Sequence, residues 1–396
     1  MLAGIAELAA GDADRPEDAL DAEQWASTML GMMRDAPLPP GEDAESMLLP
    51  GFVAALEHLG TRKALATLRA VAGVSAPDYA VFAGAAGDRL AAQGLTEPAW
   101  AADLGCARPT SAALMCEEAF DDGVSVMVEF TAPNVETHTV GIYIDHNMGG
   151  LVKDVFLAGP LSEVRRLMGS RAPNQVGLAI HDLDLAEARA RAEVAFDMLD
   201  RTWNAPVNED VQPMRALIEA RLRLLPKGSE LADDAVEVTR QERAALLEDF
   251  LSSPEGERWR GDNAAEDVAQ LAIDFGAGYN HGGPLRWSPV VVEIFMMSWL
   301  PRKVMREPGF FERVPDVLRD WVKYAGRRRH VPSAPLREAV AAVNEYRLDM
   351  LDAVSDPEAW GPAKSLAVAA HDAGVDLSDA DELQRFIDRY NDELAA

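Results

Sequence analysis

The stretch SAALMCEEAFDDGVSVMVEFTAPNVETHTVGIYIDHNMGGLVKDVFLAG, residues 111–159, decides the fold of this chain. Four short runs within it, at 111–119, 124–130, 137–144 and 151–159, alternate apolar and polar side chains or are rich in β-branched residues. Such runs are typical of strands, and the connecting segments FDDG, TAPNVE and DHNMGG contain residues that turns favour. Because each connection is short, the sequence predicts an antiparallel β-meander.

Helical patterns flank the predicted sheet on both sides. Segments 52–72 and 77–93 carry apolar side chains at three- and four-residue spacing, whereas 35–51 is rich in Pro and acidic residues and is predicted to be irregular. After Pro160 the pattern is helical nearly to the end of the chain. We therefore expect a mainly helical α+β protein. Its expected domains are a helical N-terminal unit at 1–108, the sheet with following helices at 109–230, and a helical C-terminal unit at 231–396.

Capping residues predict where several helices begin and end. A polar residue three positions before a glutamate favours a helix start, as does a serine before a proline, and a glycine favours a helix end. The predicted starts are Asp184, Thr239, Asn263, Ser288, Pro362 and Ser378, and the predicted ends are Gly276 and Gly326.

Composition and charge exclude several classes of function. The chain has 396 residues, a formal net charge of −29 and 48% hydrophobic residues, with no uninterrupted apolar run of membrane-spanning length. Long-range repulsion opposes approach to nucleic acid or to an anionic membrane. The N-terminus has no basic region before its short apolar run, so we expect no signal peptide and a cytoplasmic protein. Cys106 and Cys116 show no metal-ligand spacing.

The turn between the third and fourth predicted strands gathers polar side chains that could carry chemistry. Asp145, His146 and Asn147 lie in it, and Lys153 and Asp154 follow on the next strand. Gly149 and Gly150 permit positive φ and close backbone approach, so these groups could converge on a small ligand or on one divalent ion. The same pattern is also ordinary for a hairpin turn, in which Asp and Asn bond their own backbone. Both interpretations stay open.

A second candidate site is the glycine-rich segment 276–283 and the helix after it. Tyr279, Asn280 and His281 lie in the loop, and Arg286 precedes a helix start whose free amides favour an anion. The segment lacks the phosphate-loop motif, and a purely structural loop is the alternative.

Glu293 is the one carboxylate in the apolar segment 289–300, which is predicted to form one helix. Apolar residues surround it on every face, so it is predicted to be buried. A buried carboxylate pairs with a cation or takes up a proton. Arg286 or Lys303 would be the partner of a structural ion pair, and a raised pKa would instead suit an acid or base.

Cationic residues concentrate in 286–330, which holds ten Arg or Lys against five acids, whereas the first sixty residues hold twelve acids against two arginines. The segment is expected to contact the acidic N-terminal region or a phosphate-bearing ligand. No nucleic-acid-binding motif supports a role in DNA or RNA binding.

The segments YIDHNMGGLVKDVFLAG (143–159), RWSPVVVEIFMMSWLPRKV (286–304), VPDVLRDWVKYAG (314–326), EAWGPAKSLAVAA (358–370) and GVDLSDADELQRFIDRYN (374–391) resemble proteins common in high-GC actinobacteria that have no assigned activity. The resemblance implies a bacterial cytoplasmic protein and assigns no catalytic residue.

Two classes of function remain. The first is a non-enzymatic binding or regulatory protein for an unknown protein or small anionic ligand. The alternative is an enzyme acting on a small polar or phosphorylated substrate between the 145–154 turn and the 276–293 loop and helix. Asp145, His146, Asp154 and Glu293 would be its catalytic groups, and Asn147, Lys153, Tyr279, Asn280, His281 and Arg286 would bind the ligand. No metal, nucleotide or nucleophile motif is present, so we expect no cofactor.

Overall fold

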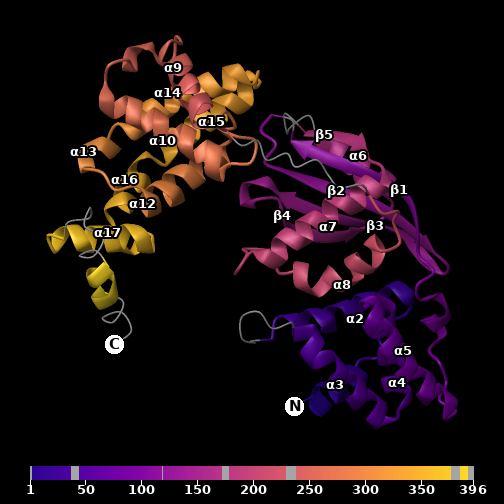
Figure 1. The fold of residues 1–396 in the computed structure, drawn as a ribbon. Helices are drawn as coiled ribbons and strands as arrows, with labels where there is room; N and C mark the ends of the chain where they lie inside the picture. The colour runs from indigo at the N-terminus through magenta and orange to yellow at the C-terminus, as the bar shows by residue number, and fades with distance from the viewer. Residues whose placement is uncertain are drawn as a thin grey trace. The chain divides into compact units, whose positions relative to one another are not determined.

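The computed structural model describes residues 2–36, 44–117, 119–171, 178–228, 238–375 and 384–390. The chain forms two compact units. Unit 1 comprises Met1–Glu118 and Gly123–Ala232, and unit 2 comprises Ala119–Asp122 and Asp233–Ala396. The chain is mainly helical with an antiparallel sheet, which confirms the predicted α+β class (Figure 1). The division into three domains stays a prediction.

The sheet of unit 1 contains the predicted meander. Strands β1 (Arg108–Glu117), β2 (Gly123–Ala132), β3 (Val135–Asp145) and β4 (Leu151–Ala158) pair with their chain neighbours in antiparallel fashion. A fifth strand, β5 (Leu178–Asp182), pairs with β1 and completes the order β4-β3-β2-β1-β5. The prediction that residues after Pro160 are helical was wrong for β5, because this short strand is defined by its pairing with β1.

Helices cover both faces of the sheet. On one face, α7 (Leu185–Arg201) and α8 (Val211–Leu222) pack on valine and isoleucine side chains of β2 and β3, and the ribbon shows α7 along the sheet (Figure 1). On the other face, α6 (Leu161–Arg171) contributes Leu161 and Val164 to a small core with Met127. Successive residues of the strands therefore contribute side chains to two different hydrophobic cores, one on each face of the sheet.

The N-terminal part of unit 1 is a helical layer. It contains α1 (Leu2–Gly11), α2 (Ala19–Arg34), α3 (Ala44–Leu59), α4 (Arg62–Val74), α5 (Pro77–Ala92) and the short η1 (Ala99–Asp103). The helix predicted at 77–93 is confirmed, whereas the one predicted at 52–72 is interrupted at Gly60, where φ is +60°. The prediction that 44–51 is irregular was wrong, because these residues form the start of α3 and supply Leu49 to the core.

A buried polar group connects the helical layer of unit 1 to the sheet. Arg221 of α8 forms an ion pair with Glu23 of α2, and its Nε donates to Nε2 of His138 on β3 at 3.4 Å. All three side chains are buried. Because Arg221 can only donate, Nε2 of His138 is the acceptor and the ring is neutral, with its proton on Nδ1, which lies 3.2 Å from the carbonyl oxygen of Glu136. Burial, followed by the charge of Arg221, lowers the pKa of His138.

The regular secondary structure of unit 2 is entirely helical among its described residues. Its main helices are α9 (Arg240–Leu251), α10 (Asn263–Tyr279), α14 (Val314–Arg328), α15 (Ser333–Glu345), α16 (Arg347–Ser355) and α17 (Pro362–Asp372). Shorter elements are η4 (Glu257–Trp259), α11 (Pro289–Glu293), the π-helix η5 (Ile294–Trp299), α12 (Leu300–Lys303), α13 (Pro308–Phe311) and η6 (Pro357–Ala359). Residues 384–390 are also helical. No described helix of the chain is both long and apolar enough to cross a membrane.

The caps were predicted better than the helix ends. Asp184 caps α7, Thr239 forms a capping box with Glu242, Ser288 caps α11, and α17 starts at Pro362. The cap of α10 is Asp262, one residue before the predicted Asn263. The predicted Ser378 cap lies outside the described residues.

Gly276 and Gly326 were wrongly predicted to end helices, because both lie inside them. A Cβ atom at Gly276 would overlap the backbone of Pro284, and one at Gly326 would overlap the side chain of Leu336. These glycines therefore permit close packing of a helix against its neighbour.

Candidate functional site

The turn predicted at 145–150 is present, with positive φ at both of its glycines: +81° at Gly149 and +83° at Gly150. Asp145 ends β3, and its Oδ1 accepts a hydrogen bond of 2.8 Å from the amide of Asn147. The amide of Gly150 closes the turn on the carbonyl of Asp145 at 2.9 Å. The carboxylate of Asp145 thus stabilises the turn.

The two polar residues that follow on β4 also take part in local structure. The carbonyl of Lys153 accepts a hydrogen bond of 2.9 Å from the amide of Asn208, and Oδ1 of Asp154 accepts one of 2.8 Å from the amide of Val155. Their side chains, like that of His146, are half-buried.

In the glycine-rich segment, α10 continues to Tyr279, whose side chain is exposed. The side-chain amide of Asn280 donates to the carbonyl oxygens of Gly283 at 3.1 Å and of Arg286 at 2.6 Å, which fixes the loop. His281 is exposed, and its carbonyl oxygen accepts a hydrogen bond from Nε of Arg286. This loop is therefore organised by its own backbone and side chains.

Arg286 is fully buried, with 0% of its surface exposed. Its Nη1 lies 2.6 Å from Oδ1 of Asp122, which also accepts a hydrogen bond of 2.7 Å from the hydroxyl of Ser288. Burial lowers the pKa of Arg286, while the neighbouring carboxylate of Asp122 opposes that shift. The guanidinium anchors residues 119–122 of unit 2.

Glu293 is exposed, so the prediction that it is buried and paired with Arg286 or Lys303 was wrong. Its carboxylate accepts a hydrogen bond from Tyr346. The predicted helix 289–300 is divided into α11, the π-helix η5 and α12, and Val290 and Ser298 also face solvent. Apolar residues on an exposed face made the segment look buried on every side.

The ten predicted site residues fall into two groups. Asp145, His146, Asn147, Lys153 and Asp154 belong to unit 1, and Tyr279, Asn280, His281, Arg286 and Glu293 belong to unit 2. Whether the two groups form one site stays a prediction.

The basic segment is engaged within unit 2. Arg327 forms a bidentate pair with Glu255 at 2.8 and 2.9 Å, and Arg328 pairs with Asp249. These acids lie at the end of α9 and in the loop after it. Arg327 and Arg328 thus bind acidic residues of their own unit, and a contact of the segment with the acidic N-terminal region or with a phosphate-bearing ligand stays a prediction.

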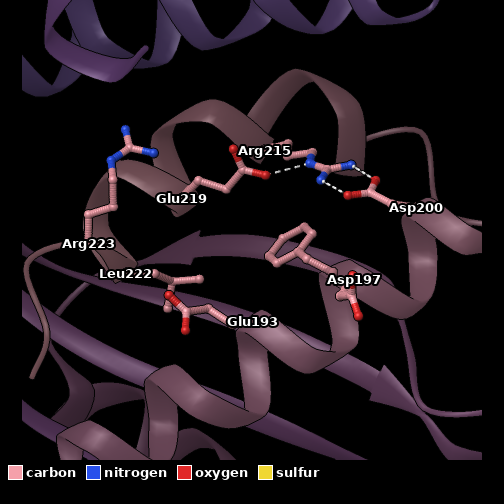
Figure 2. Close-up of a pocket in the computed structure, with 8 residues that line it drawn as sticks. Glu193, Asp197, Asp200, Arg215, Glu219, Leu222 and Arg223 are labelled. Atoms are coloured by element: carbon pink, nitrogen blue, oxygen red, sulfur yellow. Dashed lines mark hydrogen bonds and ion pairs between the residues drawn. The ribbon is translucent and has the colours of Figure 1, made fainter. Parts of the chain in front are cut away.

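One pocket of about 280 Å³ lies in unit 1 between α7 and α8. Figure 2 shows Arg215 in this pocket with Asp200 and Glu219 on either side of it, and the pairs measure 2.6 Å for each carboxylate. Burial alone would lower the pKa of Arg215, but the two carboxylates outweigh it and raise that pKa. The other two acids of the pocket, Glu193 and Asp197, also form ion pairs. We interpret this group as a structural charge network.

A second pocket, of about 290 Å³, lies within unit 2, and we call it the Lys364 pocket. Its lining residues are Met305, Arg306, Pro308, Phe311, Val354, Ser355, Trp360, Lys364 and Val368. They come from α13, α16, α17 and the segments after α12 and η6. Two of these residues are cationic and none is acidic, although the whole chain has 66 acids against 37 Lys and Arg.

Lys364 is buried, with 6% of its surface exposed. Its Nζ donates to the carbonyl oxygens of Pro301 at 2.9 Å and Val354 at 3.3 Å, and it lies 4.9 Å from the ring centre of Trp360 and 5.8 Å from that of Phe311. No carboxylate in the described residues forms a salt bridge with it. Burial lowers the pKa of Lys364.

The sequence around Lys364 explains how it reaches this position. Pro362 starts α17, which puts Lys364 in its first turn. Gly361 packs closely on α12, since a Cβ atom there would lie 2.7 Å from the carbonyl oxygen of Arg302. Trp360 is held by a hydrogen bond of 2.9 Å from its Nε1 to the carbonyl of Val354.

Sequence reasoning missed this pocket altogether. The available signal was a lysine in the apolar run AWGPAKSLAVAA of a chain that otherwise uses mostly arginine. No protein-family model, curated protein or solved structure matches the chain.

Proposed function

We propose that the protein is a cytoplasmic binding protein, and that unit 2 binds a small organic anion in the Lys364 pocket. The observation that carries this proposal is a buried lysine whose side chain lacks a carboxylate partner among the described residues. A buried charge is costly unless it is compensated, and an anionic ligand would compensate this one.

The rest of the lining defines the chemistry of the ligand. Arg306 adds a second positive charge; its side chain is half exposed and forms a loose ion pair of 3.9 Å with Asp267. Phe311, Trp360 and Val368 supply apolar walls. Ligand pockets usually measure about 300 to 1,000 Å³, so a cavity of about 290 Å³ takes a small molecule. We therefore expect a carboxylate with a short apolar body.

This site is preferred over the enzyme site suggested by the sequence because the polar groups of the latter support their own backbone. Asp145 and Asp154 accept hydrogen bonds from nearby amides, and Arg286 is buried against Asp122. The pocket around Lys364 instead combines charge, apolar surface and space.

Thermal unfolding with a panel of small anions tests the proposal. A carboxylate such as butyrate should raise the unfolding temperature, while butyramide, which has a similar shape and no charge, should not. Ligand at a hundred times its Kd stabilises the folded state by about 2.7 kcal/mol. Isothermal titration calorimetry would give the stoichiometry, which should be one per chain.

Two variants separate the pocket from general charge effects. Arg306→Gln removes a charge from the lining, and Val368→Phe fills the cavity while both cations remain. Each should abolish or weaken the shift. Arg337→Gln, which removes a charge from the exposed face of α15 in the same unit, is the matched control. Equal anion shifts in all three variants would show that binding takes place elsewhere.

A further inference from the structure

The nitrogen of Lys364 has one position that no described residue fills with a hydrogen bond. A side-chain amine has three positions besides its bond to Cε, and two of them direct N–H groups to the carbonyls of Pro301 and Val354. The described part of the chain gives Nζ no third hydrogen-bond partner. The rings of Phe311 and Trp360, both of which line the pocket, lie within 6 Å of Nζ, so the amine lies beside the pocket walls.

We propose that Lys364 forms an imine with a small 2-oxo acid bound in this pocket. The proposal rests on the anion-binding function and names its ligand class. The two backbone carbonyls orient the amine, the third position is directed to the ligand, and Arg306 provides a positive charge for the carboxylate next to the reacting carbonyl.

The chemistry needs no other reactant. The lone pair of Nζ attacks the carbonyl carbon, a C–N bond forms, and the carbonyl oxygen takes up a proton to give a hydroxyl group. The nitrogen gives up one of its two protons to that hydroxyl group, and its electron pair then forms the C=N bond as the C–O bond breaks and the oxygen leaves as water. One amine, one carbonyl compound and one proton thus give one protonated imine and one water. The protonated imine keeps one N–H, which can still donate to a backbone carbonyl.

The environment of Lys364 suits this reaction better than that of an exposed lysine. Only the neutral amine carries the lone pair, and burial lowers the pKa of Lys364, which increases its neutral fraction at a given pH. Lysines 63 and 323, by contrast, have side chains that are about two-fifths exposed and form ion pairs with aspartates. Such pairs favour the charged form.

The test is reductive trapping on the full-length chain. Protein is incubated with pyruvate and sodium cyanoborohydride, and the labelled position is found by peptide mass spectrometry. Each label adds the mass of one pyruvate less one oxygen atom. We expect Lys364 to react several-fold faster than the other five lysines of the chain. L-lactate, which replaces the carbonyl with a hydroxyl group, should bind without reacting and slow the labelling of Lys364.

Three variants test the assignment of the fast labelling to Lys364. Arg306→Gln should slow labelling of Lys364, Lys364→Arg should remove the fast phase, and Arg337→Gln should match the wild type. If Lys364→Arg does not fold, the wild type still tests the proposal, because lactate should slow the labelling of Lys364 if the imine forms in the pocket.

Two results would overturn the proposal in different ways. In the first, the most exposed lysines are labelled fastest and Lys364 is among the slowest, while lactate still raises the unfolding temperature. This result would disprove the imine and leave anion binding intact. Absence of both the label at Lys364 and any thermal shift by small carboxylates would disprove the imine and the proposed function together.

Discussion

The ring of Phe156 on β4 lies directly over Gly141, its cross-strand partner on β3. Gly141 also pairs with Met127 on β2, so it occupies the centre of the sheet on the face that α6 covers. A Cβ atom at this position would overlap the Phe156 ring. The glycine thus makes room for an aromatic side chain that shields the backbone of the sheet.

Gly141→Ala is therefore expected to destabilise unit 1 by about 1 to 3 kcal/mol, the usual cost of overpacking. Urea unfolding followed by far-ultraviolet circular dichroism measures it. Phe156→Leu removes the ring, so the double variant should be less unstable than the sum of the two single variants. Strict additivity would mean that the two residues do not interact.

A pH dependence is expected from the neutral His138. Its pKa is lowered in the folded protein by burial and by Arg221, and this shift is opposed by the hydrogen bond to the backbone of Glu136 and by the charges of Glu23 and Asp18. The unfolded chain, with an ordinary histidine pKa of about 6.5, binds more protons below that pH. The stabilising contribution is thus fully present above about pH 6.5 and is lost as the pH falls toward the folded value.

The free energy of unfolding, measured by urea titration from pH 8 to pH 5, should show this loss. One proton contributes a slope of at most about 1.4 kcal/mol per pH unit. His138→Gln removes the titrating group, so the free energy of unfolding of this variant should fall less steeply between pH 8 and pH 5 than that of the wild type. An identical profile in the variant would contradict a lowered pKa at His138.

Local patterns explain what the sequence predicted well. The alternation in 124–130 and 137–144 is a property of the strands themselves, and the Asp145–Gly150 turn follows from two glycines that both adopt positive φ. The caps at Thr239 and Ser288 are likewise local.

The failures came from contacts between residues distant in the sequence. Strand β5 exists because it pairs with β1, from which β2, β3 and β4 separate it in the sequence. The pocket around Lys364 is assembled from three helices and two connecting segments, so no short motif could reveal it. Arg286 was recognised as important, but its partner Asp122 lies more than 160 positions away.

Asp122→Asn is expected to destabilise unit 2 by about 3 to 5 kcal/mol, because it removes the carboxylate that pairs with the buried guanidinium of Arg286. Unit 2 holds five of the eight tryptophans, at 259, 287, 299, 321 and 360, so tryptophan fluorescence during denaturation reports mainly on it. Ser288→Ala, which removes a helix cap and a hydrogen bond to the same carboxylate, should cost about 1 kcal/mol. A smaller effect for Asp122→Asn than for Ser288→Ala would contradict the anchoring role of the pair.

Glu293→Gln is expected to leave stability unchanged within about 0.5 kcal/mol, because the side chain is exposed and its change leaves no buried charge unpaired. The same variant should lower the pKa of Tyr346. Burial raises that pKa first, and the hydrogen bond and negative charge of Glu293 raise it further. Ultraviolet titration of the tyrosines, with Tyr346→Phe to identify the signal, measures the shift. A loss of about 3 kcal/mol would instead be the signature of a buried ion pair at Glu293, as the apolar sequence around it suggested.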